Sequence, residues 1–182
     1  NEAIIDFRFA AVMIPSYTPE TKINETHYYE SPKTSLFSVI AENGSVMASL
    51  NRNREVVISG LTGEKPLPVK QNFLLSSVPK SIDIDAAGNY LAAGLEDFSA
   101  VIIDLNRKNI ERSFTGGHKG AVTSIALSHD NKYLATGSTD KKVIIWNIQT
   151  QKPVLKLEKH NAKITSLRFS NDDTKLISAS ED

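Results

Sequence analysis

The feature that most constrains the fold of this sequence is an internal repeat of 42 to 43 residues. Residues 121–140 align without gaps on residues 163–182, which is an offset of 42 positions. Residues 79–105 align in the same way on residues 122–148, at an offset of 43 positions. A repeat of roughly 20–50 residues is typical of solenoids, propellers and other arrays of stacked units. Few folds are therefore compatible with this chain.

Each repeat has the pattern of short strands separated by turns. In residues 164–170 apolar and polar side chains alternate with a period of two, and the polar run 171–173 separates them from a second strand. The middle repeat adds two further predicted strands, at residues 142–148 and 153–157. Four antiparallel strands in about 40–45 residues form one propeller blade, so 182 residues correspond to about four blades. We predict an all-β fold with no helix longer than about two turns.

The first 78 residues are less regular than the rest of the chain. Within residues 36–50 an Asn43-Gly44 pair lies between apolar runs, which is a strong signal for a β-hairpin. Residues 15–33 are polar and contain three prolines, so we expect a long loop or a partly ordered insertion there. We divide the chain into residues 1–78, with one or more degenerate blades and this loop, and residues 79–182, with regular blades.

The last of these blades is expected to be incomplete. Asp182 falls at the turn that would connect the second and third strands of its blade. A sheet that stops there leaves an unprotected edge strand, which folded proteins normally avoid. We therefore expect the sequence to be a piece of a longer protein.

The pairs Gly117-His118 and Trp146-Asn147 resemble the opening and closing signature of the WD-repeat (WD40) β-propeller family. The closing pair of the family is usually Trp-Asp, and Asn147 stands here in place of the Asp. The resemblance is strong over residues 79–182 and weak over residues 36–70. It implies a partial propeller, with about four blades of a ring of roughly seven.

The resemblance also implies a hydrogen-bonded relay inside the blades. A buried imidazole, hydroxyl, carboxylate and indole can each find a hydrogen-bond partner in one such chain. The roles map onto residues of two successive repeats: His118, Thr136 (or Ser138), Asp140 and Trp146 in the first, and His160, Ser178 (or Ser180) and Asp182 in the second. The preceding repeat keeps Asp97 but has Leu75 and Ile103 at the His and Trp positions. We expect apolar packing there instead of a relay.

Charge and composition exclude several classes of partner. Lys plus Arg and Asp plus Glu number 21 each, so no net field attracts nucleic acid, and we expect none to bind. The apolar stretch 4–14 contains Asp6 and Arg8 and is too short to span a bilayer, so we expect no membrane insertion. The sequence has no cysteine, which excludes disulfides and thiolate metal sites. We expect an intracellular protein, cytoplasmic or cytoskeleton-associated, with the nucleus also open.

The titratable residues do not suggest an enzyme. His118 and His160 recur at the repeat period, so they lie on different blades and cannot share a metal ion. His27 and His129 fall in a loop and a turn, where solvated side chains are the rule, and the Asp-rich turns suit backbone hydrogen bonding. We predict no catalytic residue, metal, cofactor or small-molecule substrate. The pair Tyr28-Tyr29 is either packed against the propeller or available to a partner.

The expected function is that of a non-enzymatic scaffold that binds other proteins of a multi-subunit complex. We expect the partner on the face with the loops before the first strand and between the second and third strands of each blade. The exposed positions predicted there recur at the blade period: Glu96, Lys119, Thr139, Asn161, Lys163 and Glu181. The run 65–118 is similar to centrosomal WD-repeat proteins, which implies a microtubule, centrosomal or ciliary setting. The alternative is an accessory propeller of an enzyme or of a ubiquitin-ligase substrate receptor.

Overall fold

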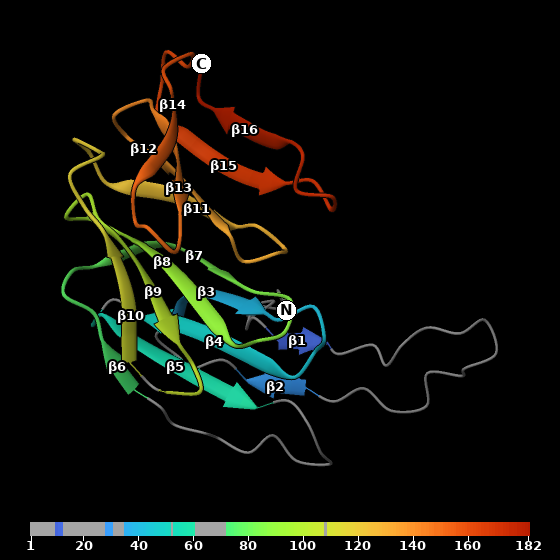
Figure 1. Cartoon of the computed structure of the whole chain (residues 1–182). Coiled ribbons are helices and arrows are strands. Elements are labelled where there is room, and N and C mark those ends of the chain that lie inside the picture. The colour runs from blue at the N-terminus through green and yellow to red at the C-terminus, as the bar shows by residue number, and fades with distance from the viewer. Residues whose placement is uncertain (1–9, 13–27, 31–34, 52, 61–71, 108) are drawn as a thin grey trace, which may run out of the picture.

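A computed structural model describes residues 10–12, 28–30, 35–51, 53–60, 72–107 and 109–182 of the chain (Figure 1). Over these residues the secondary structure consists of strands and turns, as predicted from the repeat. The described part contains no helix that is long and apolar enough to cross a membrane. The prediction of an all-β propeller fold is confirmed for this part of the chain.

The strands form three antiparallel sheets of four strands each, in which neighbours in sequence are neighbours in space. Blade 1 consists of β3 (Ser35–Ile40), β4 (Val46–Asn51), β5 (Glu55–Gly60) and β6 (Asn72–Leu74). Blade 2 consists of β7 (Pro79–Ile84), β8 (Tyr90–Leu95), β9 (Ala100–Asp104) and β10 (Asn109–Phe114). Blade 3 consists of β11 (Val122–Leu127), β12 (Tyr133–Ser138), β13 (Val143–Asn147) and β14 (Pro153–Leu157).

Two further sheets have two strands each. Blade 4 consists of β15 (Ile164–Phe169) and β16 (Leu176–Ser180), and its register repeats that of β11 and β12. The other small sheet pairs β1 (Ala10–Val12) with β2 (Tyr28–Glu30). Strand β2 lies inside the segment 15–33, for which the sequence predicted a long loop or a partly ordered insertion, and it is held there by antiparallel pairing with β1. The remainder of that segment lies outside the described residues.

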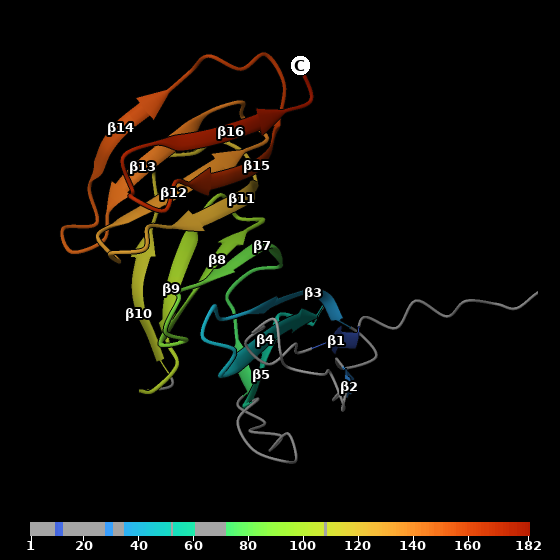
Figure 2. The same cartoon turned by 90° about the vertical axis from the view of Figure 1, so that its right-hand side faces the viewer.

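The first strands of successive blades lie side by side. Strand β11 contacts β7 on one side and β15 on the other, and β7 also contacts β3 (Figure 2). Each blade therefore turns its first strand toward a common axis, with its later strands farther out. This arrangement places equivalent loops of all blades on the same face of the molecule.

Apolar side chains fill the space between neighbouring blades. One buried cluster joins blades 1 and 2, a second joins blades 2 and 3, and a third joins blades 3 and 4. In β8 the adjacent residues Ala92 and Ala93 belong to different clusters, because successive side chains of a strand point to opposite faces. The inner blades thus bury both faces, which explains their nearly continuous apolar runs.

The turns repeat as faithfully as the strands. The turn between the first and second strands holds a residue with positive φ in every blade: Gly44, Gly88, Asn131 and Asp173. The turn between the second and third strands does the same at Arg54, Phe98 and Lys141. Glycine, asparagine and aspartate tolerate this left-handed conformation, whereas a bulky residue such as Phe98 adopts it rarely.

Candidate partner-binding face

A buried chain of hydrogen bonds joins four side chains of blade 3. The indole Nε1–H of Trp146 donates to Thr136 Oγ1 at 2.8 Å, and this hydroxyl oxygen lies 2.8 Å from His118 Nε2. The Nδ1 atom of His118 lies 3.1 Å from Asp140 Oδ2. That carboxylate oxygen also accepts the backbone N–H of Lys119 at 2.8 Å. The relay therefore connects the blade interior to the loop that presents Lys119 at the surface.

The structure also decides which hydroxyl takes part in the relay. Thr136 bonds the imidazole, whereas Ser138 Oγ donates to the backbone carbonyl of Gly120 at 2.8 Å. Both side chains are buried, and both hold the loop before β11 against strand β12.

The relay has one internally consistent arrangement of protons. Burial lowers the pKa of His118, although the neighbouring Asp140 opposes the shift, so the imidazole is neutral near pH 7. Burial raises the pKa of Asp140, but hydrogen bonds from the Lys119 amide and other groups outweigh it and bring the pKa below its usual value. The network assigns the neutral His118 proton to Nδ1, which donates to Asp140, and Nε2 accepts the Thr136 hydroxyl.

Blade 4 repeats the part of this relay that its two strands contain. His160 Nδ1 lies 3.0 Å from Asp182 Oδ1, and His160 Nε2 lies 2.8 Å from Ser178 Oγ. Asp182 Oδ2 accepts the backbone N–H of Asn161 at 2.7 Å. This backbone hydrogen bond is the largest cause that lowers the pKa of Asp182 to about 2. Asn161 is thus held in the same way as Lys119 in blade 3.

Blade 2 has no such chain among its described side chains. Leu75 and Ile103, at the His and Trp positions, are buried in the apolar cluster between blades 1 and 2 together with Ala93. Asp97 is exposed and accepts hydrogen bonds from Ser99, through its backbone N–H at 3.2 Å and its hydroxyl at 2.5 Å. Both aspartates accept the backbone N–H two residues later in the turn, but among the described residues only Asp140 also bonds the loop before the first strand.

We use the name relay face for the side of the propeller that carries the loops before the first strand and between the second and third strands of each blade. The six predicted partner-binding residues are all exposed and belong to these loops: Glu96, Lys119, Thr139, Asn161, Lys163 and Glu181. Their backbones are fixed by hydrogen bonds, among them those of the Thr139 amide to Ala121 and of the Glu96 amide to Val78.

The structure brings only some members of this set together. Lys163 Nζ lies 2.7 Å from Glu181 Oε1 within blade 4. Glu96 Oε1 lies 3.3 Å from Nζ of Lys80, a residue outside the predicted set. Among the described residues no ion pair links members of the set on different blades. The face therefore presents separate charged groups of both signs on blades 2, 3 and 4.

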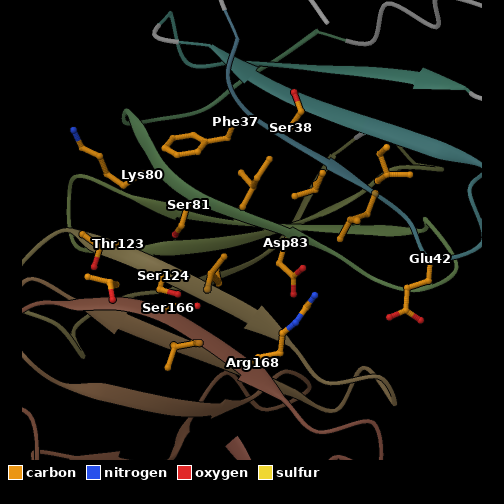
Figure 3. Close-up of a pocket in the computed structure, with 17 residues that line it drawn as sticks. Phe37, Ser38, Glu42, Lys80, Ser81, Asp83, Thr123, Ser124, Ser166 and Arg168 are labelled. Carbon is orange, nitrogen blue, oxygen red and sulfur yellow. The ribbon is translucent and has the colours of Figure 1, made fainter. Parts of the chain in front are cut away.

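A hollow of about 700 Å³ lies along the first strands of the four blades (Figure 3). Hydroxyl groups of Ser81, Ser124 and Ser166 line it at equivalent positions of three blades. The side chain of Arg168 points toward Asp83 across the hollow, in the view of Figure 3. Burial raises the pKa of Asp83, and a hydrogen bond from the Leu127 amide, 2.8 Å long, opposes the shift.

Sequence reasoning missed three residues of this region. Lys80 and Asp83 lie in a predicted strand. The sequence pattern shows that they are polar, but it does not show which groups they face. Phe98 is 47% exposed on the relay face, at the turn position that Lys141 occupies in blade 3. In the described part of the chain no three His, Asp or Glu side chains gather as ligands of a metal ion.

Comparison with known proteins identifies the repeat. The family WD domain, G-beta repeat, matches residues 109–147 and 151–182. The 66 kDa stress protein of Physarum polycephalum is 26% identical, over 96% of this chain and 29% of that protein. Protein FIZZY-RELATED 3 of Arabidopsis thaliana is 30% identical, over 49% of this chain and 18% of that protein. The crystal structure of the RRP9 WD40 repeats has a TM-score of 0.64 and 22% identity, over 76% of this chain and 43% of that chain.

These similarities show the fold and the repeat. The chain spans less than a third of the length of the two curated relatives. The likeness to the RRP9 repeats, at 22% identity, shows the fold alone. WD40 propeller domains generally mediate protein interactions and are generally not catalytic. The chain therefore carries WD40 repeats at residues 109–147 and 151–182 and has the fold of a WD-repeat β-propeller.

Proposed function

We propose that the chain binds other proteins of a multi-subunit assembly through the relay face. The observation that carries this proposal is the fixed position of equivalent loop residues in blades 3 and 4. The amides of Lys119 and Asn161 are bonded to relay carboxylates at 2.8 and 2.7 Å, so their exposed side chains stand on rigid backbone. A surface that is ordered before binding loses less entropy when a partner docks.

The charges on the face favour a protein as the partner. Lys119 and Lys163 carry positive charge, and Glu96 and Glu181 carry negative charge, all on exposed side chains. A nucleic-acid backbone requires a consistent basic stripe, whereas a protein surface can complement both signs. We therefore include neither nucleic acid nor a membrane among the proposed partners.

The proposal also concerns the kind of cellular assembly to which this scaffold belongs. A microtubule, centrosomal or ciliary assembly and an accessory role beside an enzyme or ubiquitin ligase are two alternatives that use the same face. A coiled coil elsewhere in the full-length sequence supports the first, and a catalytic motif supports the second. The absence of cysteine supports an intracellular location for either, which fluorescence microscopy of the tagged full-length protein tests.

The proposal is tested by reversing two charges on the face. In the full-length protein, Lys119→Glu with Lys163→Glu should greatly reduce the specific proteins that copurify, as measured by quantitative mass spectrometry. The melting temperature should change little, because exposed ion pairs such as Lys163–Glu181 contribute little stability.

The matched control places the same charge change on the opposite face. Lys132→Glu with Lys175→Glu alters exposed residues of the turns between the first and second strands. This control should retain the copurifying proteins. Equal retention by both double variants would contradict the proposed use of the relay face.

A further inference from the structure

The turn between β8 and β9 presents an exposed aromatic ring on a residue whose backbone φ is strained. Phe98 adopts φ 72°, close to the 71° of Lys141 and the 67° of Arg54 at the same position in the neighbouring blades. Its side chain is among the exposed large apolar groups, with 47% of the residue accessible. The strained backbone is therefore a feature that the blades share, and what distinguishes the turn of blade 2 is the half-exposed aromatic ring that it carries.

The residue before Phe98, Asp97, carries a carboxylate that is bonded differently from its equivalent in blade 3. In blade 3 the equivalent Asp140 is occupied by His118 and by the Lys119 amide. In blade 2 Leu75 replaces the histidine, and the hydrogen bonds of Asp97 within the described residues go to Ser99 through Oδ1 alone. Among the described residues the Oδ2 atom of exposed Asp97 has no donor, so it can accept from an external group.

The neighbouring charges are already engaged. Glu96 is paired with Lys80 at 3.3 Å. Arg54, on the adjacent loop of blade 1, donates from Nη1 to the carbonyl of Ser76 at 3.1 Å. Within the described residues neither cation forms an ion pair with Asp97. The turn therefore combines, in adjacent residues, one exposed aromatic ring and one carboxylate that forms no ion pair within the described part of the chain.

We propose that the Asp97-Phe98 turn binds an arginine side chain of the partner protein. A guanidinium group is planar, so it can lie on the ring face of Phe98 while its N–H groups donate to Asp97. An ammonium group can satisfy only one of these contacts well, because it is compact and strongly hydrated. The inference rests on the proposed function, since the turn is part of the relay face, and it specifies the chemistry of the partner in blade 2.

A fluorine label on the ring tests this proposal directly. In the full-length protein, 4-fluorophenylalanine at position 98 is observed by ¹⁹F NMR during titration with the amides of N-acetyl-arginine, N-acetyl-lysine and N-acetyl-citrulline. The arginine probe should give a saturable shift, with an affinity about threefold to tenfold above that of the lysine probe. The citrulline probe, which has nearly the same shape but no charge, should give no saturable shift.

Two controls isolate the carboxylate and the turn. Asp97→Asn keeps the ring and should abolish the saturable arginine shift. The same label at position 141 occupies the equivalent turn of blade 3, where Asp140 is engaged, and should not respond to arginine. An equal response to all three probes, an unchanged response in Asp97→Asn, or an equal response at position 141 would overturn the proposal.

A second measurement separates this proposal from the proposed function. Phe98→Ala should reduce retention of the copurifying proteins severalfold, whereas Lys141→Ala should not. If the Lys119 and Lys163 reversals abolish retention but arginine causes no saturable ¹⁹F shift, the proposed arginine site is wrong and the proposed use of the relay face is supported. If the label binds arginine but no relay-face variant changes retention, the arginine site stands and the proposed function is wrong.

Discussion

Blades 2 and 3 have the same strands and turns but are held together by different chemistry. Blade 3 connects Trp146, Thr136 and His118 through hydrogen bonds to Asp140. Blade 2 has apolar residues at the first three positions, and Ile103 and Leu75 are almost completely buried. The difference teaches that the relay is not needed to form a blade. Its particular effect is to fix the loop before the first strand, through the Lys119 amide.

The two blades share one strict requirement, which is a glycine on the second strand. An added Cβ at Gly94 would lie 2.5 Å from Val122 Cγ1 of the next blade. At Gly137 it would lie 2.8 Å from Ile164 Cβ of the following blade. These distances are far below ordinary van der Waals contact, so the glycine permits the close approach of neighbouring blades. This constraint is independent of the relay.

The largest expected effect therefore falls equally on both blades. Gly94→Ala and Gly137→Ala should each destabilise the protein by about 3 kcal/mol, because the new methyl group forces neighbouring blades apart. Urea titrations of the two variants measure this effect, with exposed Thr139→Ala as a control that should cost little. A large loss for only one glycine would show that the two blade junctions are not equivalent.

The second prediction is a different loss of stability in blades 2 and 3. Asp140→Ala should cost about 1–3 kcal/mol, because the His118 imidazole and the Lys119 amide lose their acceptor. Asp97→Ala should cost less than about 0.5 kcal/mol, because its hydrogen bonds with Ser99 lie at the exposed surface. The free energy of unfolding in urea decides between them. Equal losses at the two positions would contradict the distinct roles assigned to the two carboxylates.

The third prediction concerns the stability of the folded protein at acid pH. The folded protein holds the pKa of His118 below its usual value, mainly through burial. Below about pH 6.5 the unfolded chain therefore binds a proton that folded His118 does not, and stability falls as the pH decreases, by at most about 1.4 kcal/mol per pH unit. His118→Gln should flatten this part of the stability curve. The equivalent position of blade 2 adds nothing to this slope, because Leu75 cannot titrate. An unchanged slope in His118→Gln would show that His118 is not its source.

The sequence predicted the blades because the apolar pattern and the turns repeat. The sequence did not distinguish the Thr136 hydroxyl from that of Ser138 as the member of the relay, since the two residues lie on the same face of one strand and are both buried. Only the position of Thr136 between the imidazole and the indole distinguishes them. Contacts that occur once, such as that of Asp83 with the Leu127 amide, have no counterpart in the repeat and could not be predicted from it. The strained turn was hidden because Phe98 and Lys141 are not residues that signal positive φ.

A smaller effect is expected at that strained turn. Phe98→Gly and Lys141→Gly should each stabilise the protein by about 0.5–1 kcal/mol, because glycine adopts φ near 70° without strain. Thermal unfolding measures the gain, and Thr139→Gly, at a neighbouring turn position without positive φ, should not show it. Similar gains in the two blades would show that the backbone strain is the same and that only the side-chain chemistry differs. A loss at Phe98 would instead show that the ring stabilises the folded state.

The smallest effect lies on the face opposite the relay, where His129 of blade 3 joins two other blades. Its Nδ1 lies 2.8 Å from Asp173 Oδ1 of blade 4, and its Nε2 lies 3.9 Å from Glu42 Oε1 of blade 1. The hydrogen bond to Asp173 is the largest cause that raises the pKa of His129, and nearby Arg168 opposes the shift. The His129 contribution to stability therefore changes with pH in the direction opposite to that of His118. The stabilisation is fully present below about pH 6.5 and is lost as the pH rises through the raised pKa of the folded state.

Because 34% of the His129 side chain is exposed, solvent screens these charges and the expected loss is only a few tenths of a kcal/mol. Urea midpoints at closely spaced pH values from 6 to about 8 measure it. His129→Gln keeps an N–H donor but cannot titrate, so this variant should lose the decline on the alkaline side while keeping the acid-side decline that His118 causes. High salt should weaken the effect in the parent protein, because the charges are partly exposed. If His129→Gln keeps the alkaline-side decline, another group is responsible, and the contact between blades 1, 3 and 4 does not depend on the charge of His129.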